Sequence, residues 1–123
     1  MMSVWRVTGF LVFAALGQAA AAGEADVIDA KITRSGSGAY TISATLRHAD
    51  TGWDHYADGW DVVAPEGTVL GTRKLLHPHV EEQPFTRSLS GVAIPDGTEF
   101  VIIRARDKVH GAGGAEFRIN LTE

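Results

Sequence analysis

The sequence has 123 residues, of which 45% are apolar and 21% charged, with 14 glycines, 4 prolines and no cysteine. These values fit one globular domain and exclude a disordered chain, a disulfide scaffold and any cysteine-based catalysis or metal binding. With 11 Lys and Arg against 15 Asp and Glu, and no basic tract, the charge pattern argues against nucleic acid as a partner.

Residues 1–22 have the pattern of a signal peptide. Arg6 is followed by a short apolar run over residues 7–16, and the alanines at 19–22 offer the small residues that a signal peptidase reads. The run is shorter than a membrane-spanning helix requires, so cleavage near Ala22–Gly23 is expected, and a retained anchor is the alternative. The sequence therefore predicts a periplasmic or secreted domain of residues 23–123, with no transmembrane segment after cleavage.

The remaining chain is predicted to be all β. Alternating apolar and polar residues favour strands, and no stretch shows the apolar stripe of a helix. The strands are expected at 26–33, 40–47, 60–64, 69–76, 85–94, 101–106 and 117–121. Seven short strands in about 100 residues indicate a single immunoglobulin- or fibronectin-like β-sandwich.

The connections between these strands are of two kinds. The first, third and fifth are tight turns of Gly, Ser, Pro and Asp, at 35–38, 65–67 and 95–97. The second, fourth and sixth are long. Because consecutive strands of a sandwich generally run in opposite directions, the long connections should meet at one end. They contain all five histidines of the sequence: His48, His55, His77, His79 and His110.

Convergent imidazoles predict a metal site at this end. His77 and His79 are spaced i and i+2 around a proline that favours extended backbone, so their side chains should point the same way. They are the expected core ligands, joined by His55 and His110 and then by His48. Imidazoles without thiolates suit Cu(II) or Zn(II). Alternatively, these histidines only hydrogen-bond loop backbone, as the strand-end position of His48 also predicts.

Aromatic residues at the same end indicate a second possibility, a metal-free module that binds a protein or glycan. Trp53 and Tyr56 would be the contact residues, whereas Trp60 should lie in the core. No catalytic residue is singled out, so catalysis is not predicted. A row of basic residues (Arg104, Arg106, Lys108) is expected to form a solvated sheet face.

Two segments carry a family resemblance. HADTGWDHYADGW at 48–60 and HPHVEEQPFTR at 77–87 resemble a small family of uncharacterised exported bacterial proteins. The resemblance implies a protein of the bacterial envelope. It implies no particular activity, oligomeric state or partner.

Overall fold

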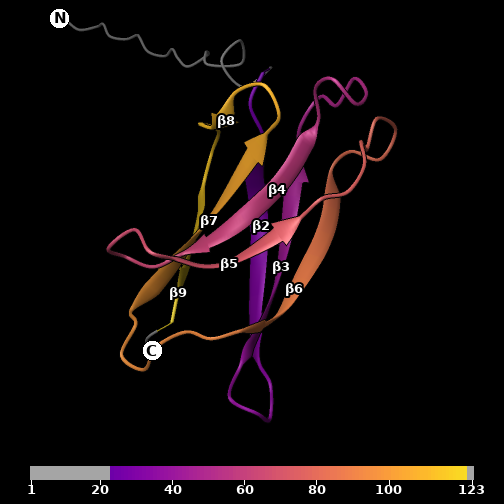
Figure 1. Cartoon of the computed structure of the whole chain (residues 1–123). Helices are drawn as coiled ribbons and strands as arrows, with labels where there is room; N and C mark the ends of the chain where they lie inside the picture. The colour runs from indigo at the N-terminus through magenta and orange to yellow at the C-terminus, as the bar shows by residue number, and fades with distance from the viewer. Residues whose placement is uncertain (1–22, 122–123) are drawn as a thin grey trace, which may run out of the picture.

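The computed structural model describes residues 23–121, which form two antiparallel β-sheets and no helix (Figure 1). The strands are β2 (Asp26–Arg34), β3 (Tyr40–Arg47), β4 (Ala57–Val63), β5 (Val69–Lys74), β6 (Phe85–Val92), β7 (Phe100–Asp107), β8 (Gly111–Ala112) and β9 (Phe117–Asn120). The all-β prediction is confirmed. The seven expected strands are all present, and the two-residue β8 lies inside the sixth connection.

The sheets divide the strands as a fibronectin-like sandwich does. One sheet has the order β2-β3-β6, and the other has the order β5-β4-β7, with both β8 and β9 paired to β7. Some strand ends differ from those expected. β4 begins at Ala57 rather than Trp60, because Ala57 and Gly59 already pair with Asp107 and Arg106 of β7. β5 and β6 end two residues earlier than predicted.

The core lies between the sheets and follows the alternation of the strands. Ile42, Ala44 and Leu46 of β3 face Val101 and the other inward residues of β7, and all of them are buried. Trp60 is fully buried, which confirms its predicted place in the core. Burying large apolar side chains from both sheets is the main source of stability in a domain without disulfides.

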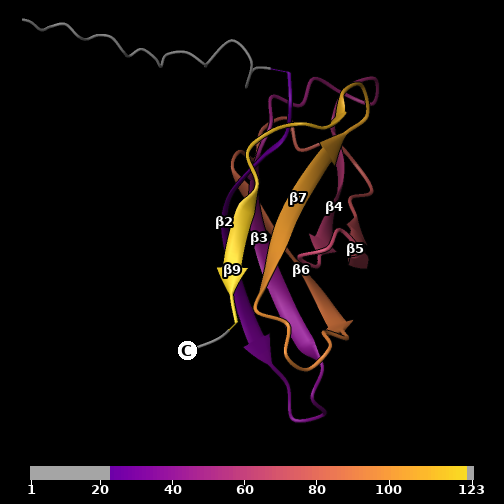
Figure 2. The same ribbon diagram turned by 90° about the vertical axis from the view of Figure 1, so that its left-hand side faces the viewer.

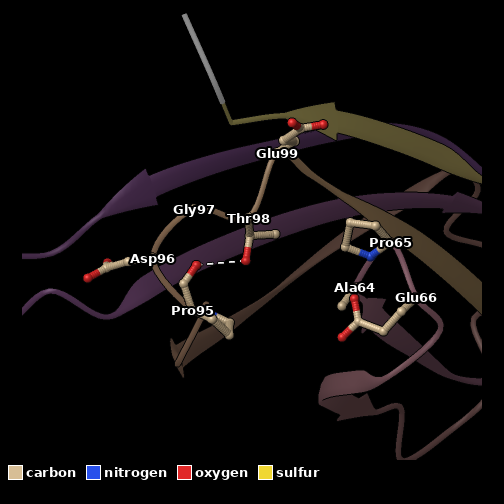
Figure 3. Close-up of a pocket in the computed structure, with 8 residues that line it drawn as sticks. All are labelled: Ala64, Pro65, Glu66, Pro95, Asp96, Gly97, Thr98 and Glu99. Atoms are coloured by element: carbon tan, nitrogen blue, oxygen red, sulfur yellow. Dashed lines mark hydrogen bonds between the residues drawn. The ribbon is translucent and has the colours of Figure 1, made fainter.

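The two ends of the sandwich differ in character. The β2–β3 and β6–β7 turns lie at the lower end in Figure 1, and the β4–β5 turn lies higher, at the left edge of that view, with residues 64–66 beside residues 95–99 of the β6–β7 turn. The long connections gather at the opposite end, which Figures 1 and 2 show uppermost. An open depression of about 420 Å³ lies between residues 64–66 and 95–99 at the turn end. Figure 3 shows one hydrogen bond among its lining residues, from the Thr98 hydroxyl to the Pro95 carbonyl. No histidine lines this depression.

Candidate metal centre

A polar site lies at the end of the sandwich with the long connections, and each sheet contributes one inward-facing residue to it. Alternate residues of β3 face the core, with Leu46 the last of them in the strand. His48 is the next residue of this alternation and lies just after the strand ends. Alternate residues of β7 also face the core, and Asp107 follows Ala105 in this alternation at the end of the strand. The side chains of His48 and Asp107 are both completely buried. The site therefore lies between the sheets, where the apolar core gives way to polar side chains.

A turn in the β3–β4 connection adds His55 to this pair. Gly52 and His55 form an isolated bridge, and the Thr51 amide donates to the His55 carbonyl. Gly52 has a φ of 148°, a conformation that favours glycine at this position. The turn leaves the His55 side chain 23% exposed and directs its ring toward His48, with ring centroids 4.7 Å apart.

His48, His55 and Asp107 present their ligand atoms to one another. The two Nε2 atoms lie 3.3 Å apart, His48 Nε2 lies 3.6 Å from Asp107 Oδ2, and His55 Nε2 lies 3.3 Å from Asp107 Oδ1. Two facing ring nitrogens cannot both carry protons without a steric clash, so at least one lone pair points into the group. Within residues 23–121, this is a group of three side chains that could hold a metal ion.

The spacing of the two imidazole nitrogens matches tetrahedral coordination. Zn–N bonds of about 2.0–2.1 Å place neighbouring ligands about 3.3–3.4 Å apart, since a tetrahedron's edge is about 1.63 times its centre-to-corner distance. Adjacent ligands of a square-planar Cu(II) would be closer, at about 2.8 Å for bonds of the same length. The 3.3 Å between the two Nε2 atoms is close to the tetrahedral value, whereas the distances of 3.6 and 3.3 Å to Asp107 involve different oxygens of its carboxylate.

Asp50 fixes the orientation of His48. His48 Nδ1 lies 2.5 Å from Asp50 Oδ1, and because a carboxylate accepts hydrogen bonds, the proton belongs on Nδ1. This tautomer leaves Nε2 with its lone pair toward His55 and Asp107. Asp50 is held in turn by the Ala57 amide on Oδ1 and by the His79 amide on Oδ2. A carboxylate behind a histidine is a common device for orienting metal ligands.

The Asp107 carboxylate is stabilised in its charged form. Burial opposes its ionisation, but the backbone amides of His110 and Val109 and the His110 ring donate to it and hold its pKa below the usual value. His110 Nδ1 lies 3.2 Å from both oxygens, and the ring is 37% exposed at the rim of the site. The structure thus places His110 against both the Asp107 carboxylate and the His55 ring, whose centroid is 5.0 Å from its own.

His77 and His79 lie at the same end but outside the three-residue group. Their rings are neighbours, with centroids 4.7 Å apart, as the i and i+2 spacing predicted. The His79 ring stacks on Phe85 at 4.0 Å, and burial lowers the pKa of its imidazole, with Arg87 adding to the effect. His77 Nδ1 faces the Pro78 carbonyl. Among the described residues, no third ligand joins this pair.

The other predicted contact residues form the outer surface of this end. Trp53 is 61% exposed and lies edge-on to Tyr56, with ring centroids 5.6 Å apart. Lys108 donates to the Trp53 carbonyl and lies over the Tyr56 ring. The expected solvated basic row is instead partly paired, because Arg104 and Arg106 both contact the buried Asp61 of β4.

Sequence reasoning did not assign two of the acidic residues that matter here. Asp107 had a detectable signal, because it continues the buried alternation of Val101, Ile103 and Ala105. An aspartate at such an inward position requires a polar partner. Asp50 had no comparable signal, since it lies in an irregular connection and bonds both to the two ends of that connection, at His48 and Ala57, and to the distant His79.

Fold and site together define a cysteine-free β-sandwich with a buried histidine–aspartate group between its sheets. No family model and no solved structure matches the sequence. The chain is 45% identical over 91 residues to a protein of Halomicrobium mukohataei described as a "Putative lipoprotein". The aligned region covers 74% of this chain and 44% of that relative, so the chain spans less than half of the relative's length. Within residues 23–121, no helix is long and apolar enough to cross a membrane.

Proposed function

We propose that this protein is exported to the cell envelope and binds one divalent transition metal ion, Zn(II), through His48, His55 and Asp107. The single observation that carries the proposal is the convergence of two ring nitrogens and a carboxylate at 3.3–3.6 Å in a buried position. The signal-peptide pattern of residues 1–22 and the homologue described as a lipoprotein support an envelope location.

The identity of the metal follows from the ligand set and its spacing. Two imidazoles and a carboxylate, without thiolate or thioether, suit Zn(II) or Cu(II) and disfavour Cu(I). The 3.3 Å between the two imidazole nitrogens is closer to a tetrahedral than to a square-planar edge and favours Zn(II) over Cu(II). Asp50 behind His48 and His110 behind Asp107 would hold both ligands in place without rearrangement when the ion binds.

The test is metal analysis of the exported protein, purified without a histidine tag and without chelators. We expect close to one zinc per chain, and one high-affinity site by calorimetry after the metal has been stripped and Zn(II) added back. His55→Ala should abolish this binding, and because the His55 side chain is partly exposed, the variant should still fold. His77→Ala is the matched control, an exposed histidine at the same end.

Three outcomes would refute the proposal. A chain that stays metal-free in excess Zn(II) and Cu(II) has no such site. Binding that survives His55→Ala but is lost in His77→Ala would move the site to the His77–His79 pair. Stoichiometric copper without zinc in the protein as purified would overturn the choice of metal, because Cu(II) generally binds such ligands more tightly than Zn(II) and displacement alone does not decide it.

A metal-free binding module is the second candidate, and the exposure of Trp53 favours it. Trp53 and Tyr56 form an aromatic surface, and Tyr56 also lines a cavity of about 290 Å³ beside Asp58 and Arg106. Such a surface suits a sugar ring or a protein side chain. Trp53→Ala should then abolish capture of that partner, whereas it should leave Zn(II) affinity unchanged.

A further inference from the structure

We propose that cleavage of the Ala22–Gly23 bond creates a further metal ligand, the α-amine of Gly23, which completes the coordination of the ion. This inference rests on the proposed function, because it adds a ligand to the same site. In the cleavage, water is added across the peptide bond, leaving a carboxylate on Ala22 and a free amine on Gly23. The three side chains then need one further donor for four-coordinate Zn(II).

Gly23 already lies against the three-residue group. Its carbonyl oxygen is 3.2 Å from His55 Nε2, about the same distance that separates the other ligand atoms from one another. The nitrogen and carbonyl oxygen of one residue are separated by two carbons, so together they can close a five-membered chelate ring on a metal ion. Gly23 therefore offers two donor atoms from a single residue once its nitrogen is a free amine.

The packing of Gly23 against the site leaves no room for a side chain unless the His110 ring moves. A Cβ atom at position 23 would lie 2.7 Å from Cε1 and 2.9 Å from Nε2 of His110. Real Cβ atoms essentially never approach so closely, so an alanine would displace the His110 ring that donates to Asp107. The close packing of backbone against imidazole is the arrangement expected where a main-chain group takes part in a site.

The segment after Gly23 is fixed by the β8–β9 connection. The Val27 amide donates to the Ala115 carbonyl, and the Ala115 amide donates to Asp26 Oδ1. Gly114 packs so closely on the Ala25 carbonyl that any side chain at 114 would clash with it. Ala25 itself is buried. The backbone is therefore held in place from β2 back to Gly23, the residue that cleavage would make the first of the chain.

Residues 24–27 reach the site beside β9, on the side opposite the β5–β6 connection that holds His77 and His79. An amine at Gly23 is also chemically suited to the site, since a neutral nitrogen donor resembles imidazole in its preference for Zn(II) and Cu(II).

The test compares Zn(II) affinity before and after the α-amine is blocked. The exported full-length product is purified, and its intact mass identifies the first residue. The α-amine is then acetylated near neutral pH, where it reacts before the lysines because its pKa is about 7.7–8.0 against about 10.4 for lysine. A product carrying a single acetyl group is selected by mass, and circular dichroism confirms its fold. Losing a direct ligand should weaken Zn(II) binding at least about 10-fold, the lower limit for losing a group behind a ligand.

The outcomes separate this inference from the proposed function. A chain that begins at Gly23 and loses affinity on acetylation, with binding abolished by His55→Ala, supports both. A chain that begins elsewhere, or one whose affinity is unchanged by acetylation while His55→Ala still abolishes binding, overturns the amine ligand and leaves the three-residue site standing. Insensitivity to both changes would refute both.

Discussion

Replacing Asp50 with asparagine should weaken metal binding although Asp50 does not itself face the proposed ion. Asp50 accepts three hydrogen bonds, from His48 Nδ1 and the Ala57 amide on one oxygen and from the His79 amide on the other. An asparagine has one acceptor oxygen and one NH₂ group. Either orientation of the amide therefore turns a donor toward a donor.

The two orientations have different costs. If the NH₂ group faces His48, the imidazole must shift its proton to Nε2, which removes the lone pair directed at the metal position, and the Ala57 amide loses its acceptor. If it faces the His79 amide, a buried donor loses its acceptor, at a cost of about 1–3 kcal/mol in the free energy of unfolding. Loss of a group that orients a ligand typically weakens metal affinity 10- to 100-fold, or about 1.4–2.7 kcal/mol.

The assay is Zn(II) affinity by competition with a chromophoric chelator, together with urea unfolding of the metal-free protein. Asp54→Asn is the matched control, because it makes the same change of charge on an exposed residue of the same connection. We expect Asp54→Asn to keep both affinity and stability. An Asp50→Asn variant with unchanged affinity and unchanged stability would refute the assignment of Asp50 as the residue that orients His48.

Three further predictions test the ion pair, the core and the effect of metal on stability. Burial opposes ionisation of Asp61, but hydrogen bonds from Arg106 and Thr72 hold its pKa below the usual value. Its stabilising contribution should therefore be complete above about pH 4 and lost as the pH falls through the lower folded pKa. Asp61→Asn should cost about 1–2 kcal/mol in urea unfolding at pH 7, and the difference from wild type should shrink in acid. Trp60→Ala should cost about 3–5 kcal/mol by the same assay, and a smaller loss would show that the core collapses around the missing ring. Zn(II) at 100 times its Kd should stabilise the domain by about 2.7 kcal/mol, a rise of about 10–20 °C in Tm that a chelator reverses; an unchanged Tm would mean that the folded state does not bind the ion preferentially.

The sequence was sufficient to predict the architecture and the gathering of the histidines. The period-two alternation predicted the sandwich, and the antiparallel course of its strands predicted which connections share an end. Both inferences depend only on local spacing and on counting strands. That is why His48, His55 and His110 were placed near one another although they lie in separate connections.

The grouping of ligands within that end depends on longer-range contacts. His77 and His79 are neighbours, but the segment that carries them lies against the start of β6. His79 therefore stacks on Phe85 instead of reaching His48. His55 enters the group only through the Gly52 turn, whose backbone conformation no periodicity reveals. Asp107 is the exception, because its inward position could be predicted from β7 alone.

The proposed site would also reinforce a β-sandwich that has no cysteine. Antibody domains link their two sheets with a disulfide beside a buried tryptophan. Here His48 follows β3 of one sheet, Asp107 ends β7 of the other, and Trp60 is buried in the same core. A metal ion held by both residues would join the two sheets at the end with the long connections. Because an ion that binds only the folded chain adds its binding free energy to stability, such a link would be adjustable by metal concentration, whereas a disulfide link depends on redox conditions.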